Sequence, residues 1–222
     1  MGRLGLTNSI ICDTMKNLIE EIEKIRKSEV KKIIDKRLSE FKKIRKKDFN
    51  EIFKELCFCL LTANFSAERA IYIQKNIDDG FLNLDKNLLE AKLKNLGHRF
   101  PNARACFISE ARKMTKEIEK KISECKNEYE LREWLVKNIK GLGYKEASHF
   151  LRNIGFENLA IIDFHIIDIL ERYKLIKRPK TLTKKKYLEI EKILSKLAKK
   201  MNMSLAELDL YLWYLETGKV LK

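Results

Sequence analysis

The sequence predicts an all-α protein made of two helical subdomains. Hydrophobic residues make up 45% of its 222 residues, which is typical of a globular chain with a buried core. Only 8 glycines and 2 prolines interrupt it, few for a protein built from strands and hairpins. Apolar residues recur at helical spacing along most of the chain. Helices packed around an apolar core are therefore expected.

The first half of the chain contains amphipathic helical patterns and one helical pattern that is apolar on nearly every side. Residues 15–47 show the periodicity of two amphipathic helices, whereas residues 1–14 precede convincing periodicity. The stretch FKELCFCLLTANFSAERAIYIQKNI, which begins at Phe53, is apolar on nearly every side of its first half, as in a helix buried in a domain core. A turn is expected near Gly80, and the next helix ends at Gly97.

The second half continues with shorter helices. Asn102, after Pro101, is a candidate cap for the first of them. The others are expected near residues 112–124, 127–139, 144–154, 164–174, 184–201 and 204–217. The last begins with the capping box Ser204-Leu-Ala-Glu207 and ends at Gly218. The charged run KRPKTLTKKK, from Lys177, is predicted to be a solvated linker.

These helices are expected to form two subdomains that flank a basic active-site cleft. One subdomain joins residues 1–45 to residues 156–222. The other is a helical bundle over residues 46–155, which ends in a helix-hairpin-helix unit with its hairpin at residues 140–144. The two are expected to meet where a ligand would enter.

The charge of the chain favours an acidic partner. Lysine and arginine number 47 against 32 aspartates and glutamates, a formal net charge of +15. Nucleic acid is the most common partner of such a chain. Lysine-rich surfaces also stabilise thermophile proteins, so charge supports nucleic-acid binding without deciding it.

The cysteines and the apolar runs exclude several classes of protein. The 5 cysteines have neither zinc nor iron–sulfur spacing, and Cys57 and Cys59 lie within an apolar stretch. We therefore expect reduced thiols in a cytoplasmic protein with no metal site. No apolar run reaches the length of a membrane span, and the N-terminal residues lack the core of a signal peptide.

The segment KGLGYKEASHFLRN, which starts at Lys140, carries the main functional signal. A helical projection separates its residues into two faces. The predicted core face holds Ala147, Phe150, Leu151 and Ile154. The opposite, displayed face holds Lys145, His149 and Arg152. Lys145 is thus expected to be accessible in the first turn.

Two interpretations of Lys145 remain open from its position alone. Free N–H groups at a helix start, with those of the Gly141-Leu-Gly143 hairpin, bind phosphate oxygens. The same partial positive charge favours a neutral amine on Lys145, which could act as a nucleophile and form a Schiff base. Alternatively, Lys145 is an ordinary surface lysine that contacts a phosphate.

Asp163 is the second candidate functional group. It follows four apolar residues in LAIIDFHIIDIL and precedes a helix with an apolar face, so it is well placed as an N-cap. Near a nucleophilic lysine, its carboxylate could instead accept protons or stabilise a developing oxocarbenium ion. One helix and one loop separate Asp163 from Lys145, so both could face one cleft.

KGLGYKEASHFLRN followed by IIDFHI resembles the signature of the helix-hairpin-helix DNA glycosylases. The match is nearest to the archaeal 8-oxoguanine DNA glycosylase/AP lyases, the second Ogg family. KELCFCLLTANFSAERA, KNLGHRFPNARACFISEAR and the closing ELDLYLWYLETGKVLK are similar to the same group. The resemblance extends from about Met15 to Lys222. Phe164 stands where an arginine is expected, and the endonuclease III branch fits less well because no cysteine follows Cys125.

The resemblance implies a mechanism and a substrate. Lys145 would be the nucleophile and Asp163 the catalytic carboxylate of a base excision repair enzyme. Such an enzyme removes oxidised guanine from double-stranded DNA and cuts the strand by β-elimination, with no cofactor, metal or iron–sulfur cluster. The expected protein is a monomer in the cytoplasm, at the nucleoid, with no membrane association.

Further residues are candidates for DNA and base contacts. His98, Arg99 and Phe100 combine hydrogen-bond donors with an aromatic wedge that could replace an extruded base. Asn64 and Phe65 interrupt a helix where the family approaches the lesion strand. The additional DNA contacts expected from the hairpin segment are Gly141, Gly143, His149 and Arg152.

The base pocket needs an acceptor, because 8-oxoguanine carries an N–H at N7 where guanine has a lone pair. The main-chain carboxylate of Lys222 could supply this acceptor, as the resemblance also implies. Trp213 could stack on the base, although a tryptophan in an apolar helix more often belongs to the core.

Three functions remain open on the sequence. The first is the 8-oxoguanine glycosylase and lyase. The second keeps the chemistry but acts on another oxidised base, as endonuclease III does. The third is a non-catalytic helix-hairpin-helix module that binds DNA through Gly141 and Gly143.

Overall fold

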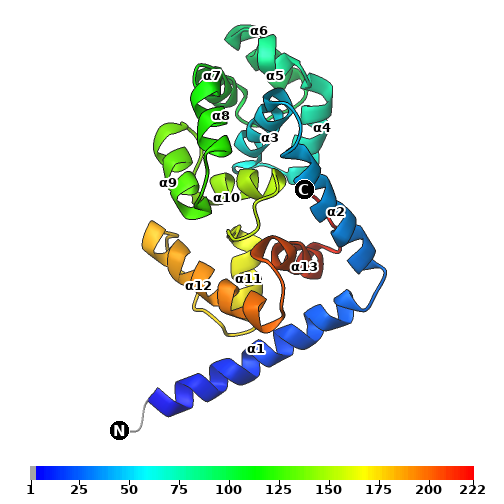
Figure 1. Cartoon of the computed structure of the whole chain (residues 1–222), viewed down its shortest axis with the longest axis vertical. Coiled ribbons are helices and arrows are strands. Elements are labelled where there is room, and N and C mark those ends of the chain that lie inside the picture. The colour runs from blue at the N-terminus through cyan, green and yellow to red at the C-terminus, as the bar shows by residue number, and fades with distance from the viewer. Residues whose placement is uncertain (1–3) are drawn as a thin grey trace. The chain divides into compact units, whose positions relative to one another are not determined.

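The computed structural model describes residues 4–222, and over this range the protein is helical, without a β-strand. It forms two compact units (Figure 1). Unit 1 contains the chain through Ser39 and Glu157–Val220. Unit 2 contains Glu40–Phe156 and the last two residues, Leu221 and Lys222.

Unit 1 is built around its last helix. Its helices are α1 (Leu4–Arg26), the first part of α2 (Val30–Ile44), α11 (Phe164–Arg172), α12 (Lys184–Lys200) and α13 (Leu205–Thr217). Helix α13 packs against α1, α11 and α12. Ser204 caps it, as expected, through a hydrogen bond of 3.0 Å from the Glu207 N–H to Oγ, and Gly218 ends it in the left-handed conformation.

Unit 2 is built around the apolar helix that the sequence predicted. Its helices are α3 (Phe49–Thr62), α4 (Ala67–Ile77), α5 (Gly80–Asn83), α6 (Lys86–Asn95), α7 (Pro101–Arg112), α8 (Thr115–Ser123), α9 (Glu128–Asn138) and α10 (Tyr144–Asn153). Helix α3 packs against α4, α5, α7 and α10. Every residue from Ile52 to Thr62 is buried, including two charged residues, Lys54 and Glu55.

An extended segment in unit 1 leads from Glu157 to Asp163 without regular structure. Two side chains of α12 supply its hydrogen bonds. The Tyr187 hydroxyl donates to the Ala160 carbonyl at 2.7 Å and accepts from the Ile162 N–H at 3.2 Å. The Glu191 carboxylate accepts from the Ala160 N–H at 2.9 Å. Because these groups are buried, the bonds fix the backbone just before Asp163.

Most predicted helices are present, and the differences are local. The first helix begins at Leu4 and not near residue 15. Asn102 does not cap α7, because Pro101 occupies its first position and the Asn102 amide instead donates to Glu90. The charged run from Lys177, which was predicted to be a solvated linker, is attached to α11 because Arg178 forms ion pairs with Asp168 and Glu171.

The two compact units do not divide the chain quite as expected. The unit boundaries fall at Ser39 and Phe156, whereas the sequence suggested residues 45 and 155. Leu221 and Lys222 group with unit 2 and not with the rest of the C-terminal segment. None of the helices that the structure describes is long and apolar enough to cross a membrane.

Replacement of Tyr187 by phenylalanine should destabilise unit 1. The substitution leaves the Ile162 N–H without this acceptor and the Ala160 carbonyl without this donor, at a cost of about 1–3 kcal/mol. Urea denaturation followed by circular dichroism would measure the change. The control Tyr72→Phe alters an exposed tyrosine and should change the free energy of unfolding by less than about 0.5 kcal/mol. Equal stability of the two variants would contradict the assigned role of the hydroxyl.

Candidate active site

The hairpin before α10 requires glycine at its first position. Gly141 has a φ of +89°, in the left-handed region that favours glycine. A Cβ atom there would lie 2.4 Å from the Phe107 ring, so both the backbone conformation and the close contact exclude other residues. Gly143, the N-cap of α10, has a φ of −89° and is not restricted in this way.

The first turn of α10 places Lys145 beside a carboxylate. The Gly143 N–H donates to Glu146 Oε2 at 3.3 Å, which is one half of a capping box. Glu146 Oε1 also lies 3.9 Å from Lys145 Nζ. The Lys145 side chain is 22% exposed. Glu146 was not predicted from the sequence to have a role, although its position three residues after Gly143 is the signal for such a cap.

The rest of α10 is buried on all sides. The predicted core residues Ala147, Phe150, Leu151 and Ile154 are each fully buried. The prediction that His149 and Arg152 lie on a displayed face is wrong, because they are only 6% and 5% exposed. A helical projection separates polar from apolar side chains, but it does not show that neighbouring elements cover the polar face.

The buried polar side chains of this face contact one another and aromatic rings. Arg152 donates to the Asn153 side chain at 3.0 and 3.2 Å, and its guanidinium lies 4.9 Å from the centre of the Phe41 ring. His149 packs edge-on against Phe58 of α3. Direct DNA contacts by His149 and Arg152, which the sequence suggested, are therefore not supported.

His149 is held in its neutral form. Burial lowers the pKa of its imidazole well below the usual value, and the positive charges of Arg152, Lys145 and Lys222 act in the same direction. The main chain of Lys222 lies near the ring and acts weakly in the opposite direction, raising the pKa. Lys145, His149 and the C-terminal residue therefore lie within one electrostatic environment of unit 2.

In the loop before α7, two of the three residues predicted to contact DNA are exposed to solvent. Arg99 and Phe100 are exposed, and the Arg99 guanidinium lies 5.0 Å from the centre of the Phe100 ring. His98 is 4% exposed, and the expectation that its ring is free to contact DNA is wrong. Its Nε2 lies 3.1 Å from the Leu61 carbonyl oxygen, and its Nδ1 accepts from the Phe100 N–H at 3.0 Å.

His98 also joins this loop to the break between α3 and α4. The Phe65 ring packs on the His98 ring, with ring centres 4.2 Å apart. Asn64 is exposed and has a φ of +55°, a left-handed conformation that asparagine tolerates better than most residues. The structure thus brings Asn64, Phe65, Arg99 and Phe100 together on the surface of unit 2.

Asp163 in unit 1 acts as the predicted N-cap of α11. Its Oδ1 accepts from the Ile166 N–H at 3.0 Å, and the side chain is partly exposed. The other residue of unit 1 that the sequence singled out, Trp213, is also partly exposed. Its ring meets His165 edge-on, with ring centres 4.7 Å apart.

No metal centre is apparent in the part of the chain that the structure describes. No three histidine, cysteine, aspartate or glutamate side chains lie close enough there to hold an ion. Cys57, Cys59, Cys106 and Cys125 form no disulfide, and burial raises the pKa of the Cys59 thiol well above its usual value. The side chain of Cys12 lies outside the described residues.

Comparison with known proteins identifies relatives over almost the whole chain. A protein of Methanocaldococcus jannaschii described as 8-oxoguanine DNA glycosylase/AP lyase is 56% identical over 206 residues, which cover 92% of this chain and 99% of the relative. A protein of Korarchaeum cryptofilum with the same description is 52% identical and covers 93% and 98% of the two chains.

Solved structures agree with these relatives. The crystal structure of the M. jannaschii 8-oxoguanine glycosylase/lyase in complex with a 15mer DNA containing 8-oxoguanine matches with a TM-score of 0.90 and covers 92% of this chain and 99% of that one. The 8-oxoguanine DNA glycosylase of Thermotoga maritima, 45% identical, matches with a TM-score of 0.88 over 94% of this chain and 100% of that one.

The family model described as 8-oxoguanine DNA glycosylase matches residues 34–203, which include the hairpin, Lys145 and Asp163. This range spans most of the chain and parts of both compact units. The resemblance inferred from the sequence motifs is thereby confirmed, and the chain belongs to the family of 8-oxoguanine DNA glycosylases.

Proposed function

We propose that this protein is a bifunctional DNA glycosylase and AP lyase that excises 8-oxoguanine from double-stranded DNA and cuts the strand at the resulting abasic site. The observation that carries this proposal is the partly exposed Lys145 side chain, which follows a glycine hairpin in a chain 56% identical to a protein described with both activities. The enzyme acts as a monomer in the cytoplasm, with a lysine in place of any cofactor.

Lys145 supplies the nucleophile for both steps. Its Nζ attacks C1′ of the damaged nucleoside, and the C1′–N9 bond breaks with its electron pair leaving on the base. Opening of the sugar ring gives a protonated Schiff base between Lys145 and C1′. Loss of a C2′ proton then breaks the C3′–O3′ bond, and water releases the lysine.

Asp163 serves as the catalytic carboxylate. Its negative charge stabilises the oxocarbenium character that develops as the C1′–N9 bond lengthens. It also accepts a proton from the attacking amine of Lys145. One carboxylate oxygen accepts the Ile166 N–H, which holds the side chain in place at the start of α11.

The hairpin and the loop before α7 bind the DNA. The backbone amides around Gly141 contact a phosphate, although Glu146 already accepts the N–H of Gly143. Phe100 fills the space left by the extruded base, and Arg99 contacts the unpaired cytosine or its backbone. Asn64 and Phe65 lie beside this loop and approach the lesion strand.

Two groups recognise the extruded base. The main-chain carboxylate of Lys222 accepts the N7–H that distinguishes 8-oxoguanine from guanine. Trp213 stacks on the ring of the base. Excision should therefore be far faster for 8-oxoguanine than for guanine in the same sequence.

Borohydride should trap a covalent complex between the protein and DNA that contains 8-oxoguanine. Reduction of the Schiff base makes the bond permanent, and Lys145→Gln should abolish the trapped species because an amide cannot form an imine. Gel electrophoresis of denatured samples measures the adduct. The control Lys32→Gln, at an exposed lysine of unit 1, should trap as the parent does. Adduct formation by the Lys145→Gln variant would exclude Lys145 as the nucleophile.

Asp163→Asn should separate the structural role of this residue from its chemical role. Asparagine caps helices as well as aspartate does, so the melting temperature should stay within about 2 °C of the parent. Excision of 8-oxoguanine should fall by roughly 10²-fold or more, because the negative charge is lost. Single-turnover kinetics would measure the rate. A variant of unchanged activity would leave Asp163 as a helix cap alone.

Phe100→Ala should slow excision from duplex DNA by about tenfold or more, because extrusion of a base costs a few kcal/mol that the wedge offsets. Cleavage of a single-stranded abasic substrate should change less than twofold. The matched control is Tyr129→Ala, which removes an exposed aromatic ring on α9. Equal effects of Phe100→Ala on the two substrates would contradict a wedge.

A further inference from the structure

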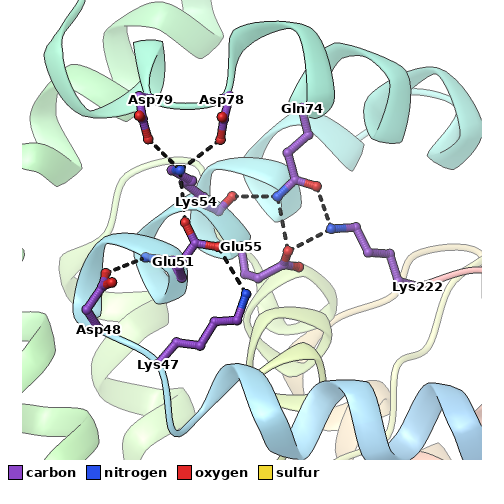
Figure 2. A network of polar contacts seen from close by, with 9 residues as sticks. All are labelled: Lys47, Asp48, Glu51, Lys54, Glu55, Gln74, Asp78, Asp79 and Lys222. Atoms are coloured by element: carbon purple, nitrogen blue, oxygen red, sulfur yellow. Dashed lines mark hydrogen bonds and ion pairs between the residues drawn. The ribbon is translucent and has the colours of Figure 1, made fainter.

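Glu55 is a buried carboxylate in the middle of the apolar helix α3, where it is 5% exposed. Its Oε1 accepts from Lys222 Nζ at 2.6 Å and from the Gln74 side-chain amide at 3.1 Å (Figure 2). Its Oε2 accepts from the Asn153 amide of α10 at 3.1 Å. Both carboxylate oxygens are thus bonded, and one partner is the ammonium of the last residue in the sequence.

The C-terminal residue is held at more than one point. Besides Glu55, Lys222 Nζ donates to the side-chain oxygen of Gln74 (Figure 2). The ammonium also lies 4.5 Å from the centre of the Phe58 ring, within reach of a cation–π interaction. The main chain of Lys222 lies near enough to the buried ring of His149 to influence the pKa of the imidazole. The Lys222 side chain is thus held by Glu55, Gln74 and the Phe58 ring.

Lys54, the residue before Glu55 on α3, does not compensate the charge of Glu55. Lys54 precedes Glu55 on α3, but its ammonium forms ion pairs with Glu51, Asp78 and Asp79 at 2.9, 2.7 and 2.5 Å (Figure 2). Glu55 instead forms its ion pair with Lys222. Because a buried carboxylate needs a compensating charge, Lys222 and not Lys54 is the lysine that compensates Glu55.

This anchor bears on base recognition, and its role there rests on the proposed function. Hydrogen-bond selection between 8-oxoguanine and guanine requires an acceptor placed within about half an ångström. The terminus of an unrestrained chain is mobile and cannot provide such placement. Lys222 is restrained. Its charge and that of Lys145, which lies one turn before His149 on α10, both lower the pKa of the His149 imidazole, so the two lysines lie near the same ring.

We propose that Glu55 and Gln74 are positioning residues for substrate selection. By clamping the Lys222 side chain within unit 2, they fix the main-chain carboxylate that accepts the N7–H of 8-oxoguanine. Neither residue touches the base, and neither takes part in the Schiff-base chemistry. The clamp therefore sets the preference for 8-oxoguanine over guanine and leaves reaction at an abasic site, which has no base, unaffected.

The test compares the parent with Glu55→Gln in two assays on the full-length chain. The first measures the ratio of excision rates for 8-oxoguanine and guanine in otherwise identical duplexes. The second measures borohydride trapping on a duplex with a preformed abasic site. Glu55→Gln should lower the ratio by about tenfold or more, the effect of losing one well-placed buried hydrogen bond. Trapping at the abasic site should stay within twofold of the parent.

Two further variants sharpen the test. Glu51→Gln is the matched control, because it removes a carboxylate from the same helix while Lys54 keeps two partners; it should preserve the ratio. The double variant Glu55→Gln/Lys222→Met removes both charges and leaves no buried ion unpaired, so it should fold even if Glu55→Gln alone does not. The single variant Lys222→Met is measured beside it. The ratio of excision rates for 8-oxoguanine and guanine should be no lower in the double variant than in Lys222→Met, because the two side chains act as one unit.

Three results would overturn the proposal. A parental ratio in Glu55→Gln, or independent, additive losses in the double variant, would exclude the clamp. Equal losses in the excision and abasic-site assays would indicate a general structural role. Failure of the proposed function itself is separately visible, because the parent would then neither excise 8-oxoguanine nor form a trapped adduct.

Discussion

The burial of α10 beyond its first turn is the constraint on which the rest of the site depends. From Ala147 to Asn153 every residue of this helix is buried, although three of them carry strongly polar side chains. Such groups are tolerated in a protein interior only when they are hydrogen-bonded or neutral. Arg152 is bonded to Asn153, and His149 is held neutral by burial. Reactive groups on α10 are thus limited to the first turn, where Lys145 lies.

The same constraint involves Lys222, which groups with unit 2. Asn153 donates to Glu55 of α3, and Glu55 accepts from the Lys222 ammonium, so one end of the polar face of α10 is joined to α3 and to Lys222. The carboxylate and the ammonium satisfy one another, whereas Nδ1 of the neutral His149 ring has no hydrogen-bond partner. The helix that carries Lys145 and the residue Lys222 are therefore parts of one packing arrangement, which is why we propose that the two act in the same site.

The sequence predicted local features well and burial less well. Helix periodicity and capping signals identified the helix before Gly97, the cap at Ser204 and the N-cap at Asp163, because these depend on residues close in sequence. The displayed positions predicted for His149 and Arg152 were wrong, because both side chains are buried against aromatic rings of other segments of unit 2. Glu55 was missed entirely. A charged residue inside a stretch apolar on nearly every side was its signal, but its partner is the last residue of the chain, and periodicity cannot reveal a contact at that separation.

The central claim is that the Lys145 amine forms the covalent bond to DNA. Peptide mapping of the reduced complex by tandem mass spectrometry tests it most directly. The parent is incubated with 8-oxoguanine duplex and borohydride, then digested with nuclease and protease. We expect a residual deoxyribose fragment on Lys145 Nζ and on no other side chain. A fragment on another of the many lysines, or on the N-terminal amine, would contradict the claim.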